Sequence, residues 1–209
     1  MAYSSFTLTQ VMTQFAITVD TSRDLFGHIA PVPLGATARQ SIQDNLQLAL
    51  LIGNEKARSE FIVAQVLGEL WRHTNRRISL FSGAALDVDP ADGLNGVCDF
   101  LVGRAPQLPE VSPPLFVVVE AKKDDIQGAY GQCGAEMLAA LRLNARSNTG
   151  VETIYGCVTT GTLWRFLRMT STQLDIDVIE YHITQLDHIF GILLFMVAAA
   201  LTPAAPRAA

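Results

Sequence analysis

The stretch LFVVVEAKK at residues 115–123 decides the fold of this 209-residue chain. Its first five residues are apolar, and three successive valines without polar alternation predict a strand that is buried on both faces. Near its end stand Glu120 and Lys122, which share one face because side chains alternate along a strand. Charges at the end of a buried strand are costly unless they are paired or bind a metal. This strand end is therefore the first candidate for a functional site.

Recognisable elements flank this strand in the sequence. Upstream, Asn54 is a suitable helix N-cap, and Glu55 follows in the first turn, where negative charge interacts favourably with the helix dipole. Apolar periodicity and turn-rich boundaries define the other elements. We expect helices at 41–53, 55–74, 127–144 and 189–201, and strands at 77–83, 96–103, 152–161, 162–169 and 175–183. This order predicts an α/β fold with a central mixed β-sheet flanked by helices.

The composition limits the class of protein. The chain is 49% hydrophobic and 17% charged, which excludes a disordered chain. With so few charged side chains, part of the surface must be apolar. We therefore expect a buried partner interface, most simply in a homodimer. Three separated cysteines without a CxxC pair indicate a reduced compartment rather than a disulfide framework. A net charge of −5 excludes a histone-like nucleic-acid coat but leaves room for a local basic groove.

The chain is expected to form one main domain with additions at both ends. We assign the main domain to residues 54–202, an arm or cap to 1–53 and a disordered tail to 203–209. The first residues contain no basic segment followed by an apolar run, so we expect no signal peptide. The longest apolar run, at 189–201, has 13 residues and is too short to cross a bilayer. These features predict a soluble, cytoplasmic protein without a membrane partner.

The charged end of the central strand has a plausible chemical role together with Asp99. Asp99 lies on the preceding strand, and a hairpin would place it beside Glu120. Two carboxylates suit Mg²⁺, which prefers hard oxygen ligands and retains several waters. Lys122 could then orient or help deprotonate a water that attacks a phosphodiester. The alternative is that Glu120 and Lys122 form an ordinary cross-strand surface pair.

Other residues could complete such a site. Glu60 lies on the same helical stripe as apolar residues, where an acid is unusual, and it could reach the metal through water; alternatively it is a helix-start acid. Basic side chains could grip phosphates, although surface solvation is the simpler role for most of them. The basic candidates are Lys56, Arg58, Arg72, Arg76, Arg77, Arg165 and Arg168. Trp164 and Tyr155 could stack on bases, but a core role is simpler for both.

Several familiar motifs are missing from the sequence. The four histidines have no metal-ligand spacing, so zinc is not expected. Gly128, Gly131 and Gly134 do not match a phosphate-binding loop, and they favour close approach of another backbone to the helix. There is also no nucleophile elbow of the G-x-S-x-G type.

Taken together, these residues resemble the PD-(D/E)XK nuclease superfamily, which has the restriction-endonuclease-like fold. The core order of that superfamily is helix, three strands, helix, strand, and residues from about 56 to 160 are similar to it. Its motif has an acidic residue in the first helix, an Asp in a strand, Glu-x-Lys in the next strand and often a polar residue in the following helix. The matching positions here are Glu60, Asp99, Glu120, Lys122 and Gln132.

The resemblance implies a role for each of these residues. Asp99 and Glu120 would bind Mg²⁺ or Mn²⁺, with the Ala121 carbonyl as a further ligand. Glu60 would support the metal. Lys122 would position the attacking water.

Gln132, in the same resemblance, would orient that lysine or touch the substrate. Two positions depart from the family pattern. Cys98 replaces the proline that precedes the Asp, which is a mild change. Glu136 stands where the RecB-type branch has a Tyr, which argues against an end-processing exonuclease.

The leading hypothesis is therefore a metal-dependent nuclease-like enzyme that hydrolyses phosphodiester bonds, with DNA as the expected partner. The alternative is a catalytically silent protein of the same fold that acts as a dimeric binding or scaffold module. The acid-acid-lysine set favours the enzyme. The low charged fraction and the apolar C-terminal helix favour the scaffold.

Overall fold

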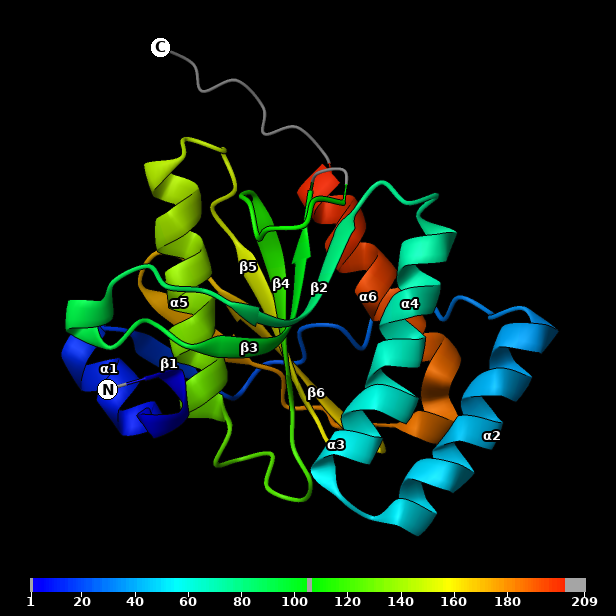
Figure 1. Cartoon of the computed structure of the whole chain (residues 1–209). Helices are drawn as coiled ribbons and strands as arrows, with labels where there is room; N and C mark the ends of the chain where they lie inside the picture. The colour runs from blue at the N-terminus through cyan, green and yellow to red at the C-terminus, as the bar shows by residue number, and fades with distance from the viewer. Residues whose placement is uncertain (1, 105–106, 202–209) are drawn as a thin grey trace.

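The computed structural model describes residues 2–104 and 107–201. Its centre is a mixed, open β-sheet of eight strands with helices on both faces (Figure 1). The strand order is β1-β7-β6-β5-β4-β3-β2, and β8 pairs with β6. The strands are β1 (Thr18–Asp20), β2 (Ser79–Ala85), β3 (Val97–Gly103), β4 (Leu115–Ala121), β5 (Ile154–Thr159), β6 (Leu163–Met169), β7 (Gln173–Ile176) and β8 (Tyr181–His182). The predicted α/β class is confirmed.

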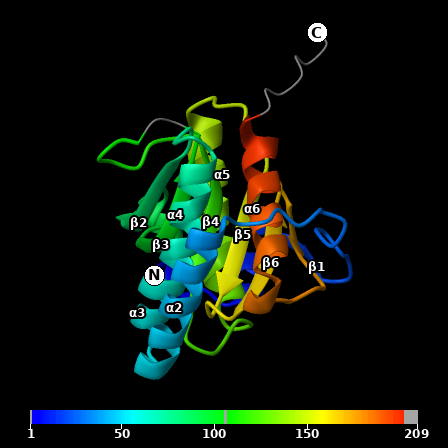
Figure 2. The same ribbon diagram turned by 90° about the vertical axis from the view of Figure 1, so that its right-hand side faces the viewer.

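The helices form two layers around this sheet. Helices α1 and α5 cover one face, and α2, α4 and α6 cover the other (Figures 1 and 2). The helices are α1 (Leu8–Phe15), α2 (Ala36–Ile52), α3 (Glu55–Arg58), α4 (Ala64–His73), α5 (Tyr130–Arg146) and α6 (Leu186–Leu201). One π-helical turn, Ser59–Val63, joins α3 to α4. Short 3₁₀ turns lie at Tyr3–Ser5, Pro90–Asp92 and Ile183–Gln185.

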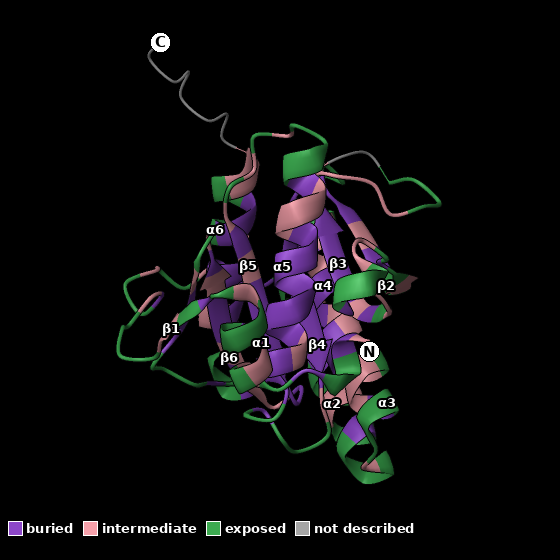
Figure 3. Cartoon of the chain, turned by 90° about the vertical axis from the view of Figure 1, so that its left-hand side faces the viewer, coloured by how far each residue is buried: buried purple, intermediate pink, exposed green. Residues whose placement is uncertain are grey.

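The central strand has the buried character that its valines predict. All seven residues of β4 are buried. It pairs antiparallel with β3 and parallel with β5, which makes the sheet mixed. Helix α5 lies along one face of these strands and is buried over most of its length (Figure 3). Polar groups at the end of β4 therefore lie between a buried sheet and a buried helix.

The helical segment from Glu55 to His73 begins where its cap predicts. The Asn54 side chain accepts a hydrogen bond from the Ala57 amide at 2.8 Å, so it satisfies one of the free N–H groups of the first turn. Ile62, Val66 and Leu70 are fully or almost fully buried on the sheet-facing side. The cap fixes the start of the helix beside the loop that follows β4.

The first quarter of the chain is built into the sheet as well as packed on it. Strand β1 pairs in parallel with β7 at the sheet edge. Helix α1 packs on α5, where a Cβ on Gly131 would lie only 2.3 Å from the Phe6 carbonyl oxygen. The expected close backbone approach at the helical glycines is confirmed there. The segment 1–53, expected as an arm or cap, therefore also supplies an edge strand.

The prediction of one continuous strand at residues 175–183 was wrong. This stretch divides into β7 and β8 because the chain turns between Asp177 and Glu180. The buried Asp177 carboxylate accepts hydrogen bonds from the amides of Leu25 and Ile179 and from the Tyr181 hydroxyl. These bonds hold the Asp177 carboxylate at the break between β7 and β8.

The C-terminal helical segment is longer than the apolar run predicts. Ile183–Leu201, with 19 residues, is long and apolar enough to cross a membrane by length and composition. Half of its most apolar window is buried inside the protein, and Ile189, Phe190 and Leu193 belong to the core. This burial is typical of a core helix. The tail expected at 203–209 lies outside the described residues.

Candidate active site at the end of the central strand

The antiparallel pairing of β3 with β4 brings two acidic side chains together. Phe100 lies opposite Val119, so the same register places Asp99 opposite Glu120. The Asp99 carboxylate accepts a hydrogen bond from the Ala121 amide at 2.8 Å. At the end of the β3–β4 pairing, the Asp99 carboxylate therefore accepts the hydrogen bond that a backbone carbonyl would otherwise accept. This bond fixes the carboxylate beside the central strand.

Lys122 joins the acidic pair from the same face. Its ammonium Nζ lies 2.6 Å from Glu120 Oε1 and 3.2 Å from Gln132 Oε1. The Lys122 amide donates to the Thr159 carbonyl at 2.8 Å, which continues the β4–β5 pairing by one residue. The side chain thus keeps the alternation that places it with Glu120. Gln132 reaches the site from the first turn of α5.

A further acid, Glu136, lies behind Gln132. The two residues are four apart on α5 and so share one face, and Gln132 Nε2 donates to Glu136 Oε1 at 3.1 Å. Glu136 is completely buried. A side-chain hydrogen bond also joins Glu136 to Glu120, and it opposes the rise in the pKa of Glu120. The sequence shows Glu136 as a departure from the family pattern, and only the packing of α5 shows that it belongs to this cluster.

Burial sets the protonation of these groups. Burial, and secondarily the charge of Asp99, raises the pKa of Glu120 to about 7. Burial and then the charge of Glu120 raise the pKa of Glu136 well above its usual range. Burial also raises the pKa of Asp99. Burial opposes the positive charge of Lys122, but the ion pair with Glu120 outweighs it, and the pKa of Lys122 is raised. Burial therefore favours the neutral form of Glu136 over its carboxylate.

The donor set fits a hard divalent cation with few protein ligands. Asp99 and Glu120 offer carboxylate oxygens beside each other at the end of β4. Mg²⁺ is commonly held by one or two carboxylates with water completing its octahedron. Across residues 2–104 and 107–201, no group of three or more His, Cys, Asp or Glu side chains forms a metal site. The cluster therefore suits Mg²⁺ or Mn²⁺ better than zinc, which is typically held by three or four His, Cys or carboxylate side chains.

The structure does not bring Glu60 to this group. Glu60 lies on the π-helical turn, its side chain is 55% exposed, and it pairs with Lys56 at 3.2 Å. In the described parts of the chain, no hydrogen bond or ion pair joins it to the acids or lysine of the site.

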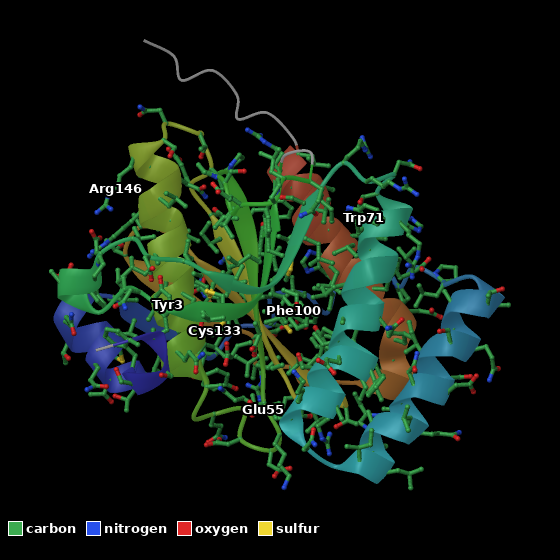
Figure 4. The ribbon with its side chains drawn as sticks, in the orientation of Figure 1. Tyr3, Glu55, Trp71, Phe100, Cys133 and Arg146 are labelled. Carbon is green, nitrogen blue, oxygen red and sulfur yellow. The ribbon has the colours of Figure 1, made fainter. Side chains whose placement is uncertain are left out.

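The helical acid that does reach the strand end is Glu55. Its Oε2 accepts from the Lys123 amide at 3.2 Å, and its charge raises the pKa values of Asp99 and Lys122. Figure 4 shows Glu55 at the lower end of the molecule, by the loop after β4. In the sequence, Glu55 is recognisable as the first residue after a helix N-cap. That position also places it beside the loop after β4.

Three of the basic residues expected to contact phosphate lie at the end of a helical segment that is distant from the site. The segment from Glu55 to His73 has 19 residues and is about 28 Å long at 1.5 Å per residue. Arg72 lies in the last turn of α4, and Arg76 and Arg77 follow that helix. This end of α4 lies away from α3 and from the loop after β4 (Figure 1). Because of this separation, they cannot contact the phosphate that the acidic pair would engage.

The remaining basic and aromatic candidates have partners of their own. Arg58 donates to the Thr160 carbonyl at 3.0 Å, Arg165 pairs with Glu180 at 2.6 Å, and Arg168 pairs with Asp175 at 2.7 Å. Trp164 is fully buried and donates to the Gly161 carbonyl, which confirms its core role. Tyr155 is partly buried and contacts Phe26 and Phe195 edge-on. Lys56 is the expected basic residue that remains exposed beside Glu55.

Sequence comparison with family models and with curated proteins finds no match to this chain. The geometry at the end of β4 is therefore the basis for any functional conclusion.

Proposed function

We propose that this protein is a metal-dependent nuclease that hydrolyses phosphodiester bonds, with DNA as the substrate. The observation that carries the proposal is the meeting of Asp99, Glu120 and Lys122 at the end of a buried central strand. Asp99 is partly buried and Glu120 is buried, and both lie beside Lys122. Apolar side chains could fill this space without the cost of removing charges from water, so packing does not explain these three residues.

The element order supports a restriction-endonuclease-like core. The helical segment from α3 to α4 is followed by β2, β3 and β4, then by α5 and β5. This is the order that the resemblance implies. The Glu-x-Lys strand is the central one, the Asp strand pairs with it on one side, and β5 pairs with it on the other.

Each residue of the site has a distinct role in this proposal. Asp99, Glu120 and the Ala121 carbonyl would hold Mg²⁺ or Mn²⁺. When bound, the ion supplies positive charge that polarises the phosphate and stabilises the charge that develops during hydrolysis. Lys122 orients the attacking water, and its contact with Gln132 restricts the positions that its ammonium can take.

The acid that supports the site from the first helix is Glu55 in this proposal, in place of Glu60. Its hydrogen bond to the Lys123 amide ties the start of α3 to the residue directly after Lys122. Its negative charge also adds to the attraction for a cation. Lys56, next to it, is exposed and forms a surface ion pair with Glu60, which a flanking phosphate would replace in this proposal.

The test is cleavage of plasmid, linear duplex and single-stranded DNA by purified wild-type protein with Mg²⁺ or Mn²⁺. Lys122→Ala should abolish cleavage, as should a chelator. Lys123→Ala is the matched control, because Lys123 is the neighbouring lysine but its side chain is exposed and pairs with Asp124. Activity in Lys122→Ala equal to that of the wild type would remove this assignment.

A second function, a catalytically silent binding or scaffold module, is favoured by one specific observation. The Lys122 ammonium is already neutralised by Glu120 at 2.6 Å, so the cluster can stand as a buried ion pair without a metal. Failure of the wild-type protein to cut any of the three DNA forms with either metal would support this function instead.

We also propose that the protein is a cytoplasmic homodimer. The C-terminal half of α2 exposes four large apolar side chains, at Leu48, Leu50, Leu51 and Ile52, and that of Leu51 is 85% exposed. Exposed apolar clusters of this kind commonly mark association surfaces.

A further inference from the structure

We propose that Glu136 is a positioning residue that fixes the orientation of the Gln132 amide and, through it, the position of the Lys122 ammonium. The inference rests on the proposed function for its catalytic consequence. The structural part of it, the control of Lys122 by Glu136, can be measured without DNA or metal.

The hydrogen bonds form a directed chain across three side chains. Lys122 Nζ donates to Gln132 Oε1 at 3.2 Å, and Gln132 Nε2 donates to Glu136 Oε1 at 3.1 Å. A glutamine amide has a donor end and an acceptor end, and it can present either one to a neighbour. An acceptor at Glu136 selects the orientation in which the oxygen of Gln132 faces the lysine. Without that acceptor, the NH₂ group could turn toward the ammonium and repel it.

In residues 2–104 and 107–201, the side chain of Gln132 hydrogen-bonds to Lys122 on one side and to Glu136 on the other. Glu136 is completely buried, and α5 packs against the sheet on either side of it through Ala135, Met137 and Ala139. Water cannot replace a fully buried acceptor without a cavity to hold it. The Gln132–Glu136 bond is therefore the contact that determines which end of the amide faces the site.

The choice of an acid at this position is poorly explained by stability. A fully buried acid is costly even though Glu136 also hydrogen-bonds to Glu120, and an apolar side chain of similar size at such a position is often neutral or stabilising. The neighbouring buried positions of α5 are apolar, so an apolar residue would suit the packing. Orienting the Gln132 amide explains the presence of Glu136, whereas packing does not.

The first readout is the rate at which acetic anhydride modifies Lys122, followed by mass spectrometry in the presence of a chelator. The chain has three lysines, and Lys56 and Lys123 are the exposed internal references, at 81% and 57% exposure against 26% for Lys122. Glu136→Leu should raise the Lys122 rate about tenfold relative to the references, which is the effect expected for one lost charge-assisted hydrogen bond. Glu136→Gln keeps an acceptor and should retain the wild-type rate.

The second readout is steady-state DNA cleavage. Glu136→Leu should lower kcat by about 10- to 100-fold with KM unchanged, as for other residues that orient a catalytic group from behind it. Glu136→Gln should restore kcat, because its amide oxygen can accept from Gln132. Asn144→Leu is the matched control: Asn144 is a buried polar residue on the same helix, but it bonds to Leu115 at the opposite end of β4. It should leave Lys122 modification unchanged.

The outcomes separate this inference from the proposed function. Unchanged Lys122 modification in Glu136→Leu overturns the positioning role, and so does a loss of kcat in Glu136→Gln equal to that in Glu136→Leu. If Glu136→Leu does not fold, Gln132→Met interrupts the same chain at a partly exposed position and must raise Lys122 modification to a similar extent. Absence of DNA cleavage by the wild type removes the nuclease proposal, while the modification rates still decide the role of Glu136.

Discussion

The cost of burying Glu120 gives a pH dependence of stability that can be worked out from the structure. Burial, followed by the charge of Asp99, raises the pKa of Glu120 from 4.5 to about 7. The folded protein therefore binds a proton more tightly than the unfolded chain does. The resulting stabilisation is complete below pH 4.5 and is lost as the pH rises through 7. At 1.36 kcal/mol per pKa unit, the loss is about 3 kcal/mol.

The perturbation that isolates this effect is Glu120→Gln, which keeps the shape of the side chain and removes its titration. The free energy of unfolding is measured by urea denaturation between pH 5 and 8 in the presence of a chelator. The wild type should lose about 2.5 kcal/mol more than the variant over this range, because part of the transition already lies below pH 5. Glu136 and Asp99, whose pKa values are also raised, contribute with the same sign and remain in the variant.

Glu60→Gln is the control for this experiment, because it makes the same chemical change at an exposed side chain. It should follow the wild-type profile. Parallel profiles for the wild type and Glu120→Gln would show that Glu120 pays no desolvation cost in the fold, and the reasoning about the site would be refuted.

Three further predictions address the fold, the assembly and the electrostatics of the site. Asn144→Ala should reduce the free energy of unfolding by about 2–5 kcal/mol, because it leaves the buried N–H and C=O of Leu115 without partners; a loss below about 1 kcal/mol in urea denaturation would contradict this. Light scattering at micromolar concentration should show a homodimer that Leu51→Asp converts to a monomer, and a monomeric wild type would count against the association surface on α2. Mg²⁺ or Mn²⁺ should raise the Tm of the wild type more at pH 8 than at pH 6, since binding requires the ionised Glu120 carboxylate; an equal shift at both values would argue against that ligand.

Much of the core could be predicted from local sequence patterns. The run of valines before Glu120 predicted a strand buried on both faces, and the side-chain alternation predicted that Lys122 would face the same side. Asn54 marked a helix start because its cap bond is made within the next three residues. These features depend on neighbours in the sequence, so the sequence shows them directly.

The parts that escaped prediction depend on partners that are distant in the sequence. The break after β7 exists because Asp177 bonds to Leu25, which is 152 positions away. The choice between Glu55 and Glu60 depends on which helical turn meets the loop after β4. An apolar stripe cannot show this, and a π-helical turn further changes the helical phase after Arg58.

The role of Glu136 was hidden for a related reason. On the sequence, it interrupts an apolar helical segment and departs from the family pattern at a position where a Tyr is common. Only the packing of α5 against β4 shows that its carboxyl group contacts Gln132 and lies in the same buried cluster as Glu120.

The central claim is that Asp99 and Glu120 form a divalent-cation site, and Mn²⁺ binding tests it most directly because it does not depend on the choice of DNA. Electron paramagnetic resonance of free Mn²⁺ in a titration with the protein counts the bound ions. The wild type should bind Mn²⁺ at a site that Asp99→Asn weakens at least tenfold and that Glu60→Gln leaves unchanged. Equal binding by the wild type and Asp99→Asn, or no binding by the wild type at millimolar Mn²⁺, would contradict the claim.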